Sequence, residues 1–369
     1  MPDRFYRPEL DALRFVAFAL VFGAHALPSR AGFEAAGIPY WFWGPIIGLK
    51  EGGGYGVDVF FLLSAYLITE ILLREYRKTG GINVQAFWIR RILRIWPLYF
   101  AFLALAYWVV PRIYAQNFPA FHALAYATFW GNFALVLESN GVNTVAGILW
   151  SVSIEEQFYL LWPLVLSLFM RRFRAICIAL IVVSTVVRAY LVSTGVDSVW
   201  SIWGNTITRL EPIAVGALIA FELHGRVPEL RNSLRGAAIA GGLFIIVICG
   251  MFFPKEGPTA MIVYPLATVA AALLLLGTLG TRIRIPHFLV YLGRISYGLY
   301  VFHALAILIA RQQIHVAHPF VEWAAQFFTA FVLTVLFASV SYRWYEKPFL
   351  RLKERFSQDA RPARAMVAQ

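Results

Sequence analysis

The chain consists largely of apolar runs of about 20 residues, and these recur from residue 10 to residue 342. A run of this length is sufficient for an α-helix to cross the hydrocarbon core of a bilayer. Only 14% of the residues are charged, whereas about a quarter are charged in a typical soluble domain. The sequence therefore predicts an all-α polytopic membrane protein.

The pattern of apolar runs predicts a bundle of about ten transmembrane helices. Their expected ranges are 10–28, 56–73, 92–110, 148–169, 174–193, 206–222, 236–253, 261–279, 295–312 and 322–342. Within 111–147, the apolar segment 121–137 is compatible with an eleventh pass, a re-entrant segment or an interfacial helix. We expect one membrane domain over residues 1–350 and a short, basic, disordered cytoplasmic tail over 351–369.

The distribution of basic residues predicts the orientation of the bundle. With the N-terminus in the cytoplasm, 24 of the 32 Lys and Arg residues lie on the inner side, 5 lie in outer loops and 3 lie within or beside helices. The five outer residues are Arg30, Lys50, Arg112, Lys255 and Arg311. By the positive-inside rule both termini are expected in the cytoplasm. The same rule explains the net charge of +12 without nucleic acid.

Three further features exclude other interpretations of the chain. Arg14 interrupts the first apolar run and acidic residues precede it, so we expect a retained helix and not a cleaved signal peptide. Cys177 and Cys249 lie in apolar runs and are expected to be packing residues. We expect no metal site and no permanently bound cofactor, because the metal-ligand and nucleotide-binding motifs are missing from the sequence.

Arg14 and His25 share one face of the first predicted helix. They are 11 residues apart, which is 20° beyond three full turns and about 16 Å along the axis. Arg14 could simply extend to the inner surface, and His25 could hydrogen-bond a neighbouring helix. The functional interpretation is a polar path with a base, His25, at its outer end.

Two carboxylates are candidates to orient His25. Asp58 lies in the first turn of the second predicted helix, at the matching outer depth, where it could also cap that helix. Glu155 projects about 100° away from Glu156 and could face the interior of the bundle. Ser153 and Glu156 have the spacing of a capping box. The predicted catalytic residues are His25, Asp58 and Glu155.

Four residues at the outer side are candidates for acceptor binding: Trp150, Ser151, Arg209 and Glu211. The alternative for Arg209 and Glu211 is an external salt bridge.

A basic cluster opens the third predicted helix on the inner side. Arg91 and Arg94 share a face and, with Arg90, could bind phosphates, although anchoring to the inner surface is an alternative. Tyr300 and His303 share a face of the ninth predicted helix, which we place in its inner half. We assign Arg14, Arg90, Arg91, Arg94, Tyr300 and His303 to an acyl-CoA-binding side on the resemblance described next.

Seven segments together resemble the acyltransferase-3 family of bacterial membrane O-acyltransferases. They are R-x10-H from Arg14 to His25, GVDVFFLLSAYLI, RRILRIWPLYF, WSVSIEEQFYLLWP, RLEPIAVGALIA, ISYGLYVFH and WYEKP, and they extend from residue 7 to residue 350. The resemblance implies a ten-helix enzyme of the bacterial inner membrane. It would transfer an acyl group, most commonly acetyl, from cytoplasmic acyl-CoA to a hydroxyl of a glycan or glycolipid, such as O-antigen, exopolysaccharide, Nod-factor or antibiotic sugars.

The resemblance also implies roles for individual residues. The Arg–His pair of the family falls on Arg14 and His25, its R-x-x-R on Arg91 and Arg94, and the acidic residue of W-S-x-x-x-E on Glu155. His25 would serve as general base or as a transient acyl carrier. Many relatives carry a fused esterase-like domain, which we do not expect here.

The sequence departs from the family pattern at Ala65, where the family usually has Gly, and at Glu211, where it often has Asp.

The alternative function is a transporter or flippase of a lipid-linked sugar or another anionic substrate, because buried ionisable residues suit that class as well.

Overall fold

The computed structural model describes residues 6–114, 119–138, 144–196 and 198–358 of the chain. Every regular element within these ranges is a helix. In chain order they are α1 (Pro8–Ala26), α2 (Arg30–Ala35), α3 (Tyr40–Gly53), α4 (Gly56–Thr79), α5 (Val84–Ala104), η1 (Leu105–Val109), α6 (Val110–Tyr114), α7 (Ala120–Ala127), α8 (Gly131–Glu138), η2 (Val145–Leu149), α9 (Trp150–Phe169), η3 (Met170–Arg172), α10 (Phe173–Ser193), α11 (Val199–Trp203), η4 (Ile207–Arg209), α12 (Leu210–Leu223), α13 (Asn232–Phe252), η5 (Gly257–Thr259), α14 (Ala260–Thr278), α15 (His287–Arg294), α16 (Ser296–Gln313), α17 (Pro319–Val340), η6 (Ser341–Glu346) and α18 (Lys347–Gln358).

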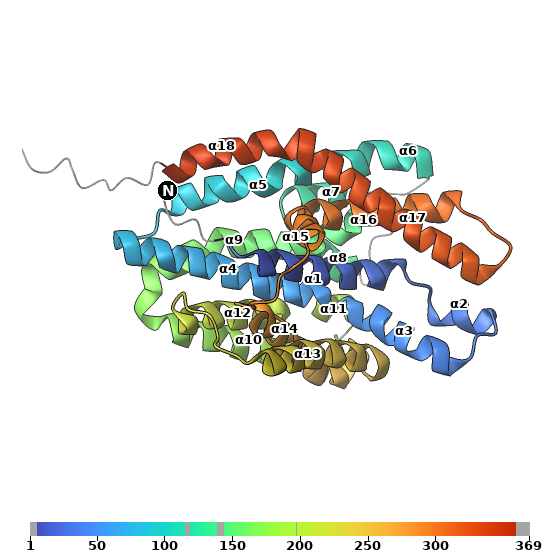
Figure 1. The fold of residues 1–369 in the computed structure, drawn as a ribbon, viewed down its shortest axis with the longest axis horizontal. Helices are drawn as coiled ribbons and strands as arrows, with labels where there is room; N and C mark the ends of the chain where they lie inside the picture. The colour runs from blue at the N-terminus through green and yellow to red at the C-terminus, as the bar shows by residue number, and fades with distance from the viewer. Residues whose placement is uncertain (1–5, 115–118, 139–143, 197, 359–369) are drawn as a thin grey trace, which may run out of the picture.

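Most of the long helices run along the longest axis of the molecule (Figure 1). The end of α4 and the start of α5 lie at one end of the bundle, on the left of the view. The opposite end carries α2, the start of α3 and the connection between α16 and α17. Because α1 leads into α2, its C-terminus faces this second end, which we call the α2–α3 end.

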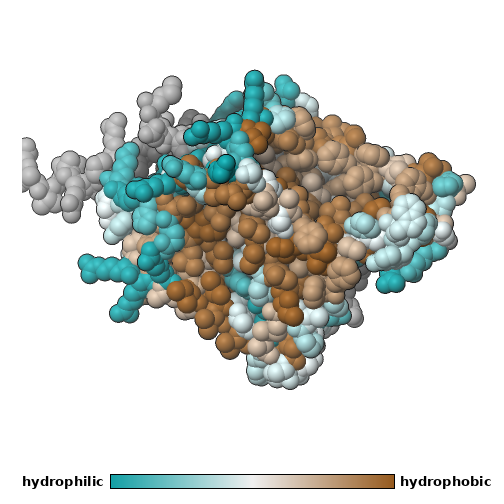
Figure 2. Space-filling view, turned by 60° about the horizontal axis from the view of Figure 1, so that its bottom comes forward, coloured by the Kyte–Doolittle hydropathy of each residue, from teal (hydrophilic) through white to brown (hydrophobic). Residues whose placement is uncertain are grey.

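The described residues include six helical stretches that are long and apolar enough to cross a membrane, or seven if the bent pair α15–α16 is one span. Figure 2 shows hydrophobic side chains covering the middle of one face, with hydrophilic residues toward its margins. The protein is therefore a multi-pass membrane protein. The ten crossings and the cytoplasmic termini stay predictions; α1 carries three charged residues, Glu9, Asp11 and Arg14, and α12 has only 14 residues.

All ten predicted ranges contain a helix, and the structure adds helices that the apolar pattern did not predict. Residues 29–54, expected as an outer loop, include the 14-residue helix α3. The segment 121–137 is divided between α7 and α8, of 8 residues each, around Phe129, whose φ is 58°. Eight residues span only about 12 Å, so neither helix can cross a bilayer. The predicted tail starts within α18, and residues 359–369 lie outside the described residues.

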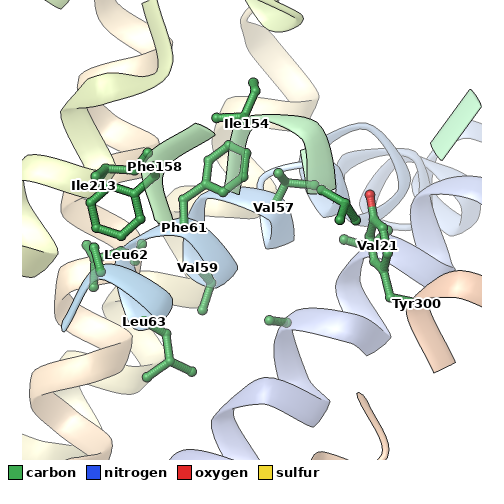
Figure 3. Close-up of a cluster of buried hydrophobic side chains, with 14 of the residues drawn as sticks. Val21, Val57, Val59, Phe61, Leu62, Leu63, Ile154, Phe158, Ile213 and Tyr300 are labelled. Carbon is green, nitrogen blue, oxygen red and sulfur yellow. The ribbon is translucent and has the colours of Figure 1, made fainter. Parts of the chain in front are cut away.

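The apolar core extends over α1, α4, α5, α9, α12, α14 and α16. Figure 3 shows Phe61 of α4 lying close to Ile154 and Phe158 of α9, with Ile213 of α12 beside Phe158. Val21 of α1 lies beside Tyr300 of α16. Phe61 and Ile154 are buried. This core holds the helices that carry the candidate site.

The sequence EGGGYG permits two close helix contacts. A Cβ at Gly52 would lie 2.1 Å from the Ile246 carbonyl oxygen of α13, and one at Gly53 would lie 2.4 Å from the Leu20 carbonyl oxygen of α1. Small residues allow helix backbones to approach this closely. The end of α3 is therefore held directly against α1, near His25.

Gly216 makes a comparable contact between α12 and α4, and its replacement tests the packing. A Cβ at this position would lie 2.1 Å from the Leu62 carbonyl oxygen. We expect Gly216→Ala to lower the unfolding free energy by about 1–3 kcal/mol, because two backbones must separate. The matched control is Gly236→Ala in α13, where, among the described residues, no atom beyond its own helix turn lies within 4 Å of the added Cβ. Equal thermal unfolding midpoints for the two variants in the same detergent would contradict this packing.

Candidate active site

His25 and His303 form a pair at the C-terminal end of α1. His25 lies on the last turn of α1, and His303 lies on α16. His303 Nε2 is 3.3 Å from His25 Nδ1, and the ring centroids are 5.1 Å apart. His303 is buried, whereas the side chain of His25 is exposed. One imidazole is thus accessible while its neighbour is enclosed by protein.

The backbone acceptors assign the protons of this pair. His25 Nδ1 is 2.9 Å from the Val21 carbonyl oxygen, and His303 Nδ1 is 2.5 Å from that of Tyr300. A carbonyl only accepts, so each Nδ1 must donate. His303 Nε2 is then a second acceptor for the His25 Nδ1 proton. His25 Nε2 keeps its lone pair, as a general base requires.

The bend before α16 explains why His303 reaches His25. The axes of α15 and α16 differ by 76°. A Cβ at Gly293 of α15 would lie 1.8 Å from the Asp11 carbonyl oxygen, so only glycine permits this contact with α1. We placed Tyr300 and His303 in the inner half of the ninth predicted helix; the structure instead brings both to residues of the predicted outer side.

Tyr300 connects the histidine pair to the start of α9. Its hydroxyl donates to the Ile148 carbonyl oxygen at 2.9 Å and accepts from Ser151 Oγ at 2.6 Å. The ring centroids of Tyr300 and His303 are 5.4 Å apart. Trp150 is buried against Trp203, at a centroid distance of 5.8 Å. Ser151 therefore joins the histidine group, whereas Trp150 packs toward α11.

Asp58 does not contact His25. Its Oδ2 accepts from the guanidinium of Arg209 at 2.7 Å, and both side chains are 1% exposed. Arg209 also lies over the ring of Trp203, 4.4 Å from its centroid. Asp58 therefore neutralises a buried arginine and joins α4 to η4.

Glu211 belongs to a second buried ion pair. Its Oε2 is 2.9 Å from Arg188 of α10, and the Arg188 side chain is 0% exposed. The external salt bridge considered for Arg209 and Glu211 is therefore wrong, because each pairs with a different residue inside the bundle. Arg188 has no predicted role, although an arginine within an apolar helix is itself a signal of a buried partner.

Three arginines gather near the N-terminal part of α5. Arg14 donates to Asp11 at 2.7 Å, and Arg14, Arg91 and Arg94 lie close enough to repel one another electrostatically. Arg91 lies over the rings of Phe87 and Tyr159, at 5.3 and 5.6 Å. In the part of the chain that the structure describes, no carboxylate lies within 4 Å of Arg91 or Arg94. Two cations that share one side of α5 thus have no direct ion-pair partner among the described residues.

Arg90 differs from its neighbours. Its guanidinium is 3.5 Å from Glu75 of α4. The structure brings Arg14, Arg91 and Arg94 together, and it directs Arg90 to this separate pair.

Glu155 lies beside the arginines and not beside His25. Its carboxylate accepts from Ser64 at 3.0 Å and from Tyr159 at 2.9 Å, and it attracts Arg14 and Arg91 electrostatically. Ser64 and Tyr159 were missed in the sequence because common polar side chains in apolar helices carry no distinctive spacing.

Glu156 accepts from Trp96 at 2.8 Å, and Ser153 donates to the Leu149 carbonyl oxygen at 3.3 Å. The predicted capping box between Ser153 and Glu156 is therefore not formed.

These features define a multi-pass helical membrane protein with a histidine pair at one end of α1 and an arginine cluster around Arg14, about 16 Å away along that helix. The chain belongs to the acyltransferase-3 family, because the family described as "Acyltransferase domain" matches residues 7–343. The resemblance seen in the sequence is thereby confirmed.

The chain is also similar to several individual proteins. Peptidoglycan O-acetyltransferase OatA of Listeria monocytogenes serovar 1/2a is 29% identical over an alignment of 385 positions, which takes in 94% of this chain and 56% of OatA. YrhL of Bacillus subtilis (strain 168), named as a candidate peptidoglycan O-acetyltransferase, is 29% identical over 325 residues, with 81% of this chain and 50% of YrhL covered. The chain thus spans about half the length of the curated relatives it matches. No solved structure matches it.

Proposed function

We propose that this protein is an O-acyltransferase of the bacterial inner membrane that moves an acyl group, most commonly acetyl, from acyl-CoA to a hydroxyl of a glycan or glycolipid. Membership of the acyltransferase-3 family and similarity to proteins named as O-acetyltransferases support the reaction. The observation that carries the proposal is His25 Nε2, which has no hydrogen-bond partner among the described residues and whose ring is positioned by Val21 and His303.

The arginine cluster is the proposed binding site for the phosphates of CoA. Arg91 and Arg94 have planar guanidinium groups suited to bidentate phosphate binding. Arg14 adds a third positive charge from α1. The long pantetheine arm would extend from this cluster toward the α2–α3 end and bring the thioester to His25.

Proton transfer by His25 then accounts for the chemistry. Its Nε2 accepts the proton of the acceptor hydroxyl as the hydroxyl oxygen bonds to the thioester carbonyl carbon. The carbon–sulfur bond breaks, and the CoA thiolate takes up the proton. His303 Nε2 accepts from Nδ1–H of His25 and stabilises the imidazolium, the role we first assigned to Asp58 or Glu155. Transient acylation of His25 is the second route, and radiolabel retained on the protein would identify it.

The arginine cluster is tested by donor kinetics. We expect Arg91→Ala and Arg94→Ala each to raise the KM for acetyl-CoA about tenfold or more with a smaller change in kcat, because a charge-assisted phosphate contact is lost. Arg90→Ala is the matched control and should change KM little, since Arg90 already pairs with Glu75. An equal rise in KM for all three variants would indicate a general loss of positive charge and not a defined site.

The reaction itself is tested with wild-type protein in lipid nanodiscs. Radiolabelled acetyl-CoA and a bacterial glycolipid extract should yield free CoA and labelled glycan. Absence of thioester cleavage across several donors and acceptors would exclude the transferase and favour transport of a lipid-linked sugar.

A further inference from the structure

Three basic residues from distant segments meet around the C-terminal end of α1. Lys50 Nζ of α3 donates to the Ala24 carbonyl oxygen at 2.9 Å, and Arg311 of α16 donates to that of His25 at 2.8 Å. Lys255, between α13 and η5, interacts electrostatically with His25, as do the other two. They are three of the five basic residues expected on the outer side.

Capping of α1 accounts for only part of this arrangement. Cations near a helix C-terminus bind its free carbonyls and offset its dipole. Lys50 and Arg311 each use one N–H donor in this way, whereas an ammonium has three N–H donors and a guanidinium five. Among the described residues no carboxylate lies within 4 Å of Lys50, Lys255 or Arg311. Arg30, another outer basic residue, is by contrast paired with Glu34 at 2.9 Å.

Lys255 is the one of the three that lies outside the helices, and its ammonium packs against aromatic side chains. It lies over the rings of Tyr55 and Trp203, at 5.1 and 4.9 Å from their centroids. A Cβ at Gly54 would come within 3.0 Å of Nζ, so this glycine leaves space beside the ammonium. Burial lowers the pKa of Lys255 to about 8, with repulsion from Lys50 contributing and attraction from Glu51 opposing it. Lys255 therefore remains mostly protonated at neutral pH.

The local charge is not balanced. Glu51 acts electrostatically on both Lys50 and Lys255, but forms no ion pair within the described ranges. Asp58 also attracts Lys255, yet its carboxylate is already bound by Arg209. Three positive charges with one exposed carboxylate leave a formal charge of about +2 beside an exposed imidazole.

We propose that Lys50, Lys255 and Arg311 form a binding site for an anionic group of the acceptor, a carboxylate or a phosphate, next to His25. The role of His25 in this proposal rests on the proposed function, but the anion site does not. The three cations hold the charged group of the acceptor while a nearby hydroxyl faces His25 Nε2. A neutral glycan of the same size would bind more weakly, because the three cations would then lack a counterion.

Matched charged and neutral probes test the site directly. N-acetylmuramic acid is compared with its methyl ester, and N-acetylglucosamine 1-phosphate with N-acetylglucosamine, by calorimetry on the wild-type protein in nanodiscs. We expect the charged member of at least one pair to bind about tenfold tighter. Preference within the first pair identifies a carboxylate ligand, and preference within the second a phosphate ligand. Equal binding within both pairs would overturn the proposal.

Variants then locate the effect. Lys255→Gln and Arg311→Gln should each reduce the preference for the charged probe, and the double variant should abolish it. Arg311→Lys should retain part of it, because a donor to the His25 carbonyl oxygen and the charge both remain. Arg30→Gln is the matched control and should leave the preference unchanged. A preference that survives in a folded double variant would place the anion elsewhere and refute the site.

Thioester consumption is measured separately on the same samples. If the wild-type protein cleaves no thioester but still prefers the charged probe, the transferase is refuted and the anion site is retained. If the wild-type protein cleaves the thioester but shows no preference for the charged probe, only the anion site is refuted.

Discussion

Replacement of His25 by Ala is expected to reduce acetyl transfer by about 10²- to 10⁴-fold, the usual contribution of a positioned general base. The imidazole is exposed and no described residue bonds its Nε2, while Nδ1 is held by the Val21 carbonyl oxygen and by His303. Alanine removes the proton acceptor but leaves the arginine cluster unchanged, so the KM for acetyl-CoA should change little. The measurement is release of free CoA together with label in the glycan.

The two histidines should differ in the size of their effects. His303 acts only through His25, so His303→Ala should lower kcat less than His25→Ala, and His303→Gln should restore part of the loss because its amide oxygen can accept the Nδ1 proton. His315→Ala is the control, since His315 is exposed and lies 3.5 Å from Glu322. Full transfer by a folded, inserted His25→Ala protein would remove His25 from the mechanism.

Breaking the Asp58–Arg209 pair is expected to cause the largest loss of stability. Both side chains are 1% exposed and the contact distance is 2.7 Å. Removal of one partner leaves an uncompensated buried charge, which costs about 3–5 kcal/mol. We therefore expect Asp58→Asn or Arg209→Met to lower the thermal midpoint strongly, or to prevent recovery of folded protein.

A double variant separates the buried charge from lost packing. Asp58→Asn combined with Arg209→Met should be more stable than Arg209→Met alone, because neither charge remains buried without a partner. The exposed pair Arg174–Glu222 serves as the control, and Arg174→Gln should change the midpoint little. Additive losses from the two buried substitutions would contradict strong coupling between them.

The sequence alone determined features that depend on local spacing. Apolar runs of membrane-spanning length predicted the helices, because hydrogen bonds within a segment must satisfy its backbone in lipid. The 11-residue spacing put Arg14 and His25 on one face of α1, since helix periodicity is a property of one segment. In the same way the i, i+3 spacing put Arg91 and Arg94 on one side of α5.

The tertiary structure alone decided which side chains meet. Asp58 binds Arg209, 151 residues away, and His303 reaches His25 over a separation of 278 residues. A buried charge pairs with the opposite charge that helix packing brings nearest. Its partner therefore cannot be deduced from the depth in the membrane at which each residue lies along its own helix. Lys50, Lys255 and Arg311, read in the sequence only as outer-loop charges, surround one helix end because Gly52 and Gly53 allow α3 to pack directly against α1 and α13.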